Sequence, residues 1–178
     1  MALDDDLVRI AAAAGEHGDV TGVLAAEPSR GRRFYLVALD VGEERRWLVL
    51  DAAAQPVDTR DDVRDAASIV AICELAGDLA GGGDLEALRQ QLAQVRMFEQ
   101  PAGIEEAEEA ALALERVIGA PPRIASPAYL DEVGVATMAL ERALGETSSP
   151  FSSAIRSATG AVEEFVQDVE RTYLLELQ

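Results

Sequence analysis

Pro56 separates two segments with different hydrophobic patterns, and this change limits the folds that the chain can adopt. From Asp19 to Asp51 the chain is rich in the β-branched and aromatic residues that strands favour, with the turn sequences PSRG and GEER between them. After Pro56, apolar residues recur every three or four positions, which is the spacing of helices that bury one face. The two patterns together predict an α+β protein that is predominantly α.

Three strands are expected before Pro56. They cover residues 19–27, 33–41 and 46–51. Short turns join them in order, so the sequence predicts a three-stranded antiparallel β-meander over residues 19–52. A helix from about Leu7 to Ala14 should precede the meander, because aspartates favour a helix start and Gly15 favours its end.

After Pro56, a bundle of about five helices is expected, on which the β-meander packs. Thr59 and Asp62 resemble a capping box that opens a helix ending near Ala80, and "GGG" follows it. Helices over residues 85–95 and 104–118 are separated by a break at Pro101 and Gly103, which favours an antiparallel αα-hairpin.

Two Ser-Pro pairs begin the last two helices. Serine suits the N-cap and proline the first helical position, which places helix starts at Pro127 and Pro150. Residues 119–127 should be a stiff loop. We expect a single domain over residues 1–178, with the N-terminal helix and meander in residues 1–58 and a helical bundle in residues 59–178.

The composition excludes several kinds of chemistry. The 178 residues contain neither lysine nor asparagine, and the codons of both are rich in A and T, so a GC-rich genome is one explanation and salt adaptation another. Without lysine, no P-loop can reach a terminal phosphate and no Schiff base can form. We expect no cofactor.

The charge, the apolar content and the single cysteine indicate the compartment of the protein and the partners that it does not bind. A formal net charge of −18 repels nucleic acids and anionic membranes. The most apolar run, Ala66 to Ala76, is too short to span a bilayer. The single cysteine, Cys73, fits a reducing compartment. We expect a cytoplasmic protein that binds neither nucleic acid nor membrane.

One hairpin raises the possibility of catalysis. In "YLVALDVGEERRWLVLDAAAQPV" (35–57), Asp40 and Gly42 stand at a tight turn between two strands. The stretch resembles the first hairpin of the sugar-kinase/actin superfamily and of ribonuclease-H-like nucleases. That resemblance implies a metal ion at Asp40 and phosphotransfer or nuclease activity. The turn differs from those families at Glu43 and Glu44, whose carboxylates repel phosphate, so this activity is the alternative interpretation.

Other candidate residues favour structural roles. His17 is the only histidine, so it cannot build a multi-histidine metal site, and Cys73 lies in an apolar helix where a thiol behaves as a small hydrophobe. The acidic run from Ile104 to Glu115 should place its glutamates toward solvent. These are Glu105, Glu108, Glu109 and Glu115.

The C-terminus is the candidate interaction site. Apolar residues cover more than one face of the last helix beyond Val169, and a helix that is apolar nearly all round needs a second partner surface. The predicted interface is Tyr173, Leu174, Leu175 and Leu177. The alternative is that these residues pack beneath the β-sheet of their own chain. The sequence thus predicts a non-enzymatic interaction or regulatory protein that binds another protein or forms a homodimer.

Overall fold

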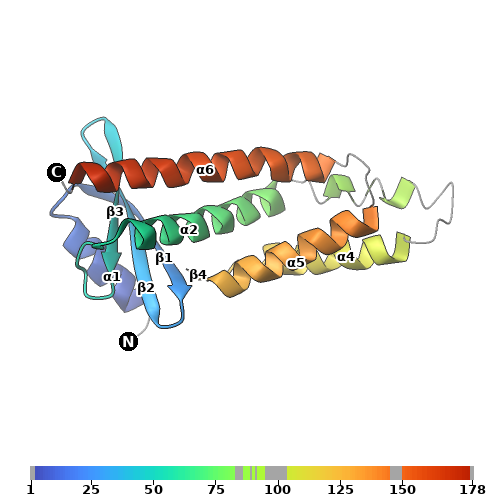
Figure 1. Cartoon of the computed structure of the whole chain (residues 1–178), viewed down its shortest axis with the longest axis horizontal. Helices are drawn as coiled ribbons and strands as arrows, with labels where there is room; N and C mark the ends of the chain where they lie inside the picture. The colour runs from blue at the N-terminus through green and yellow to red at the C-terminus, as the bar shows by residue number, and fades with distance from the viewer. Residues whose placement is uncertain are drawn as a thin grey trace. The chain divides into compact units, whose positions relative to one another are not determined.

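The computed structural model describes residues 3–82, 86–88, 90, 92–94, 104–144 and 150–176 (Figure 1). Its helices are α1 (Leu3–Ala14), α2 (Arg60–Gly81), α4 (Ile104–Ile118), α5 (Pro127–Leu144) and α6 (Pro150–Glu176). Its strands are β1 (Asp19–Ser29), β2 (Arg32–Val41), β3 (Glu44–Asp51) and β4 (Ile124–Ala125). Residues 86–88, 90 and 92–94 are also helical. The predicted fold class, α+β and predominantly α, is confirmed.

The first three strands form the expected hairpins. Strand β2 pairs antiparallel with β1 on one side and with β3 on the other. Gly31 and Gly42 stand at the two turns with φ of 81° and 68°, in the left-handed region that residues with a Cβ rarely adopt. Glycine at these two positions therefore allows the short connections on which the register of the strands depends.

The sheet has a fourth strand that the sequence did not predict. The order is β3-β2-β1-β4, and β4 runs parallel to β1, with Ile124 opposite Ala25 and Ala125 opposite Ala26. The prediction of a loop over residues 119–127 is therefore wrong at Ile124–Ala125, and the sheet is mixed rather than a pure meander. Two residues are too few to show an alternating pattern, so only their pairing with the edge of β1 reveals them as a strand.

The chain divides into two compact units. Unit 1 comprises residues 1–71, 123–127 and 162–178, and unit 2 comprises residues 72–122 and 128–161. The boundaries fall within α2 and α6, so each of these helices contributes residues to both units. The single-domain organisation expected from the sequence stays a prediction.

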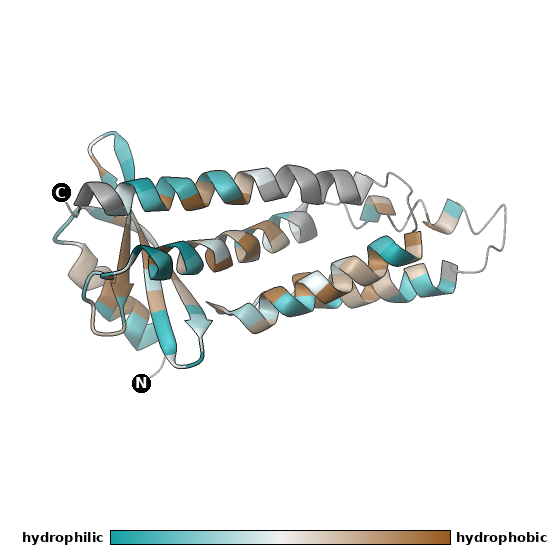
Figure 2. Ribbon diagram, in the orientation of Figure 1, coloured by the Kyte–Doolittle hydropathy of each residue, from teal (hydrophilic) through white to brown (hydrophobic). Residues whose placement is uncertain are grey.

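In unit 1, both faces of β2 are buried, because its six successive residues from Phe34 to Leu39 are each at most 7 % exposed. The ribbon coloured by hydropathy shows hydrophobic residues in the strands of this sheet (Figure 2). One face packs against Ile10 and Ala14 of α1. That face consists of Tyr35, Val37, Leu39, Leu48 and Leu50. On the opposite face, Trp47 of β3 meets Phe165 of α6 edge to face, with 4.9 Å between ring centroids. The sheet therefore lies between helical layers, which explains why β2 is apolar without interruption.

Charged groups also join α1 to the sheet. Arg9 donates a hydrogen bond to Asp6 at 3.1 Å, the Tyr35 hydroxyl donates to the same carboxylate at 3.4 Å, and Arg33 lies 4.0 Å from it. The hydrogen bond from Arg9 is the main cause that lowers the pKa of Asp6, and Tyr35 and Arg33 add to it against the opposing effect of burial. The carboxylate is thus held ionised within a partly buried network.

We expect Asp6→Asn to reduce the pH dependence of stability in acid. Because folding lowers the pKa of Asp6, its stabilising contribution is present above the unfolded-state value of 3.8 and is lost as pH falls through the folded-state value. The variant should unfold more easily than wild type at pH 7, and the difference should shrink below pH 4. Urea titrations at pH 7, 4 and 3 measure it, and a difference that is constant across these pH values would contradict this role.

The core of unit 2 is built mainly from the inward faces of α4 and α5. Its buried residues include Ala107, Ala111, Leu114 and Ile118 of α4, and Tyr129, Ala136 and Leu140 of α5. Leu88 and Leu92 add to the same cluster. The Tyr129 hydroxyl donates a hydrogen bond to the carbonyl of Val117 at 3.3 Å. Because α4 and α5 both bury one stripe, each leaves the opposite stripe toward solvent.

Candidate interaction surface

Large apolar side chains are exposed mainly on unit 2. Among the described residues, the exposed large hydrophobics are Val8 (70 %), Leu112 (48 %), Val135 (69 %) and Met138 (61 %). Val8 belongs to α1 in unit 1, whereas the other three belong to α4 and α5. Single exposed apolar residues are common on protein surfaces and need no explanation. A group of them on adjacent helices does need one.

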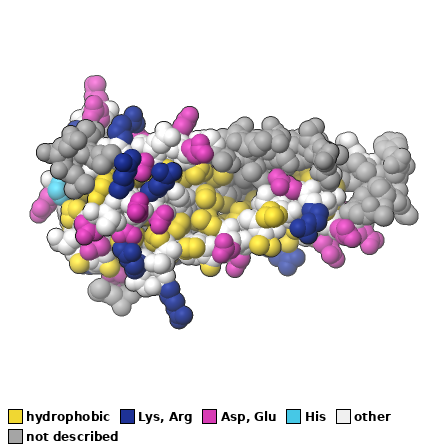
Figure 3. Space-filling model, viewed as in Figure 1, with side chains coloured by type: hydrophobic (Ala, Val, Ile, Leu, Met, Phe, Trp, Pro, Cys, Tyr) yellow, Lys and Arg dark blue, Asp and Glu magenta, His cyan; other side chains and the backbone are white. Residues whose placement is uncertain are grey.

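The exposed residues of α4 and α5 have the same spacing. Positions i, i+3, i+4 and i+7 share one face of a helix. On α4 these positions are Glu109, Leu112, Ala113 and Arg116, and on α5 they are Val135, Met138, Ala139 and Arg142. We call these eight residues the α4–α5 face. In the space-filling view, apolar side chains lie at the surface over these helices among acidic and basic ones (Figure 3).

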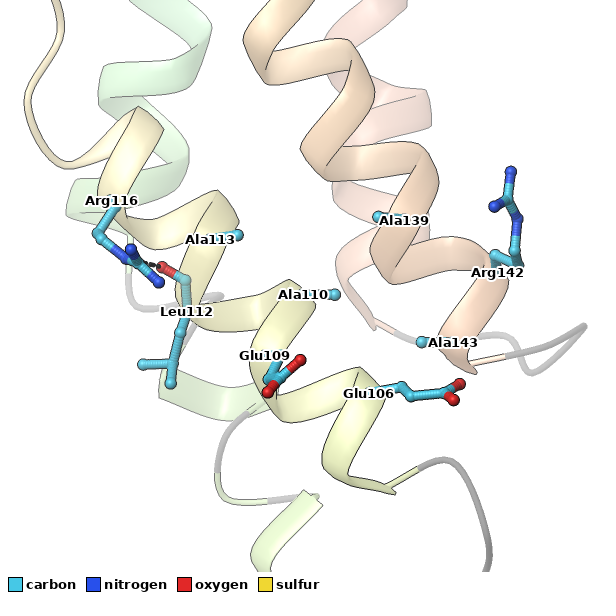
Figure 4. Close-up of a pocket in the computed structure, with 9 residues that line it drawn as sticks. All are labelled: Glu106, Glu109, Ala110, Leu112, Ala113, Arg116, Ala139, Arg142 and Ala143. Atoms are coloured by element: carbon cyan, nitrogen blue, oxygen red, sulfur yellow. Dashed lines mark hydrogen bonds between the residues drawn. The ribbon is translucent and has the colours of Figure 1, made fainter.

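An open hollow of about 560 Å³ lies between α4 and α5. The two helices run side by side in opposite directions, and the methyl groups of four alanines lie in the space between them (Figure 4). These are Ala110, Ala113, Ala139 and Ala143. A smaller hollow of about 200 Å³ lies beside Leu112, and Leu92 also lines it. Alanine side chains leave enough room for a partner helix to approach the backbone closely.

The charges on the two helices follow the same order. Along α4, Glu109 comes first, Leu112 is central and Arg116 comes last. Along α5, Asp131 precedes the apolar residues and Arg142 follows them. All four charged residues are exposed. Glu109 and Arg142 both line the hollow, and the Arg142 side chain extends away from α4 (Figure 4).

This surface has the chemistry of a binding face. Its hollow is lined by aliphatic side chains, carboxylates and guanidinium groups. In the part of the chain that the structure describes, no three His, Cys, Asp or Glu side chains come together as a metal site would require. The arrangement offers apolar anchors with charged groups at the rim, as protein interfaces do.

Asp40 lies at the exposed end of β2. In the register of the sheet it stands opposite Asp19 of β1 and Arg45 of β3. The Nε of Arg45 lies 3.3 Å from a carboxylate oxygen of Asp40. A guanidinium therefore occupies one side of the carboxylate that the hairpin resemblance assigns to a metal ion. The metal-dependent activity stays a prediction.

Tyr173 lies inside its own chain. Only 7 % of the residue is exposed, and burial is the main cause that raises the pKa of its hydroxyl, with Asp58 and Asp62 adding to the effect. Residues of its own chain therefore cover this side chain. The side chains of Leu174, Leu175 and Leu177 lie outside the described residues, so their role as an interface stays a prediction.

The remaining candidates, His17 and Cys73, belong to different units. His17 is exposed in the turn after α1 in unit 1, whereas Cys73 belongs to unit 2 and packs partly buried against its core. Burial, with a smaller effect of Glu74, raises the pKa of the Cys73 thiol to about 11. The thiol is therefore protonated at neutral pH and is a poor nucleophile.

The acidic run of α4 is exposed only in part. Glu105 and Glu109 face solvent as expected, whereas Glu108 and Glu115 are half-buried.

The α4–α5 face was not predicted from the sequence, although one signal for it was present. Leu112 follows Glu109 by three positions and therefore falls on the side of the helix assigned to solvent.

Comparison of the chain with protein-family models, with curated proteins and with solved structures gave no match. Among the described residues, no helix has both the length and the apolar character needed to cross a membrane. The functional interpretation therefore rests on the residues of the chain and their geometry.

Proposed function

We propose that this protein is a non-enzymatic interaction module and that the α4–α5 face is its docking surface. The observation that carries the proposal is the exposure of Leu112 on α4 and of Val135 and Met138 on α5. Leu112 also lines the open hollow between these helices. Apolar groups left in water cost free energy, and clusters rimmed by polar groups mark sites where another protein covers them.

The shape of the surface suits a helix. Recognition of an amphipathic helix needs a groove with apolar anchors spaced one helical turn apart. The alanine floor between α4 and α5 supplies the groove, and Leu112, which lines it, supplies one anchor. Val135 and Met138, exposed on α5, supply further anchors. Charged residues at both ends then orient the partner.

The affinity should be moderate. Complete burial of one such side chain contributes about 1.5–3 kcal/mol, and these three are already partly buried, so together they add roughly 3–6 kcal/mol. Association itself costs about 4 kcal/mol or more. The apolar contacts alone barely offset that cost. The surrounding contacts therefore determine the affinity of the complex. We expect micromolar rather than nanomolar binding.

Glutamate at an apolar anchor should abolish docking. We expect Leu112→Glu and Met138→Glu to lose partners that wild type captures from a lysate of its own cells, because each buries a charge at the centre of the contact. Quantitative mass spectrometry of the captured proteins, with light scattering of the purified variants, provides the measurement.

Val8→Glu is the matched control. Val8 is at least as exposed as Leu112 and Met138 but lies on α1, so this variant should capture the same partners as wild type. Circular dichroism checks that all three variants fold. The α4–α5 face would not be the docking surface if Val8→Glu lost the same partners as the other two variants. The same conclusion would follow if Leu112→Glu and Met138→Glu both kept the partners of wild type. A wild-type protein that is monomeric and captures nothing would contradict the proposed function.

A further inference from the structure

The charges that line the hollow between α4 and α5 restrict the partner of the α4–α5 face. We infer that this partner is an amphipathic helix with an arginine or lysine about one turn from an apolar anchor, and that the basic group binds between Glu106 and Glu109. This inference rests on the proposed function and adds the chemistry of the partner. It is supported by the position of the two carboxylates, by the surroundings of each, and by the charge of the protein.

Both carboxylates belong to the wall of the hollow. Glu106 and Glu109 line it from α4, three positions apart and therefore on one side of the helix. Both residues are exposed, and the Glu106 side chain extends toward α5 (Figure 4). Leu112, the exposed apolar anchor, follows Glu109 by three further positions. A partner that covers Leu112 therefore finds the carboxylates about one helical turn from its apolar contact.

The arginines of the hollow leave these two carboxylates accessible to a cation. In the part of the chain that the structure describes, neither Glu106 nor Glu109 forms an ion pair with an arginine. Arg142 lines the same hollow, but its side chain extends away from α4 (Figure 4). Arg116 lies at the other end of the α4 wall and donates a hydrogen bond to the backbone carbonyl of Leu112 at 3.3 Å. A basic group from a partner would therefore meet two acceptors that no described arginine occupies.

Helix formation alone does not explain both glutamates. The helix dipole stabilises acids in a first turn, which accounts for Glu106. Glu109 lies beyond this turn, and a like-charged neighbour on the same face destabilises a helix by about 0.2–0.5 kcal/mol. An arginine from a partner replaces this repulsion by attraction, because its planar guanidinium can contact two carboxylates at once. The acidic pair therefore destabilises the free chain slightly and stabilises a complex with a basic helix.

The charge of the whole protein also favours a basic partner. With a formal net charge of −18, the chain attracts basic segments at long range and raises their rate of association. Within the hollow, two glutamates at one end of the α4 wall favour the cation there, whereas Arg116 at the other end disfavours it. The partner helix should therefore bind in one orientation, with its basic residue toward Glu106.

Selection of helices by the protein tests the inference. A phage library of single helices, randomised on one face, is selected on immobilised wild type, and the enriched helices should carry arginine or lysine about one turn from an apolar residue. Fluorescence anisotropy then measures binding of the synthesised peptides. The double variant Glu106→Gln, Glu109→Gln should weaken binding by roughly fivefold to tenfold. Salt raised from about 0.05 M to about 0.5 M should weaken binding to wild type more than to this variant.

Glu16→Gln, Glu43→Gln is the matched control, since it removes the same charge from two exposed residues of unit 1 and should leave peptide affinity unchanged. Urea titration should show that Glu109→Gln is at least as stable as wild type, because the substitution removes a like-charge contact. Loss of both peptide affinity and stability in this variant would instead assign Glu109 a structural role and overturn the inference.

Enriched helices without a basic residue would also overturn the inference, as would a double variant that binds the peptides like wild type or a control that weakens binding equally. In each of these cases, loss of the same helices by Leu112→Glu but not by Val8→Glu would still support the proposed function. A library that yields no binding helix would contradict the inference as well, and capture from the lysate would then decide the proposed function separately.

Discussion

Replacement of Leu114 by alanine is expected to lower the free energy of unfolding by about 2–5 kcal/mol. Leu114 lies on the inward stripe of α4, is only 1 % exposed and belongs to the core of unit 2. Its truncation removes apolar contacts and leaves a cavity between α4 and α5. The loss is large beside a typical domain stability of about 5–15 kcal/mol. Urea titration followed by circular dichroism measures it.

Leu112→Ala is the matched control, because it makes the same chemical change two positions away on the same helix. Leu112 is 48 % exposed and lies on the opposite stripe, so its truncation should cost much less stability. It should instead weaken binding at the α4–α5 face. If both variants lost equal stability, Leu112 would be a core residue and the docking proposal would lose its main anchor.

Truncation of Tyr173 to alanine should have a comparable effect in unit 1. The ring is 7 % exposed, and truncation of large buried aromatic residues costs about 3–5 kcal/mol. A chain ending at Arg171 should lose more, since it also lacks Thr172, which is buried as well. We expect both variants to melt far below wild type in circular dichroism and to aggregate during gel filtration. A truncated chain that stays folded but no longer self-associates would instead support the C-terminal interface.

Tyr173→Phe distinguishes the contribution of the ring to stability from that of the hydroxyl. Within the described residues the buried Tyr173 hydroxyl has no hydrogen-bond partner, so its removal should leave stability unchanged or slightly raised. Because folding raises the pKa of Tyr173, wild type should lose stability as pH rises above the unfolded-state value of 10.0 and through the folded-state value. The phenylalanine variant should lose less stability between pH 9 and pH 11, as measured by urea titration.

Most of the helices and strands could be predicted from the sequence because their signals are local. The β-branched and aromatic residues of the strands, the two turns with Gly31 and Gly42, and proline at the first position of α5 each depend on a few neighbouring residues. Strand β4 has no such signal. Ile124 and Ala125 become a strand only because they pair with β1, about a hundred residues earlier in the chain.

The candidate site was less predictable for the same reason. The sequence predicted an interface at the C-terminal residues, because a helix end that is apolar nearly all round needs a partner surface. It could not specify whether the sheet of the same chain supplies that surface. The structure places Tyr173 inside its own chain. Conversely, the periodicity of α4 and α5 identified their buried stripes, whereas their exposed stripes resembled ordinary solvent-facing surface.

The sequence alone therefore determined the periods, breaks and charges of the chain, and with them the type of nearly every element. Only the tertiary structure decided which apolar residues find a partner within the chain. Burial depends on neighbours distant in sequence, and helical spacing specifies a direction around the axis but not what lies in that direction. Leu112 and Leu114 are the same residue type on the same helix, yet one is buried and the other is half-exposed, because only Leu114 points toward the core shared with α5.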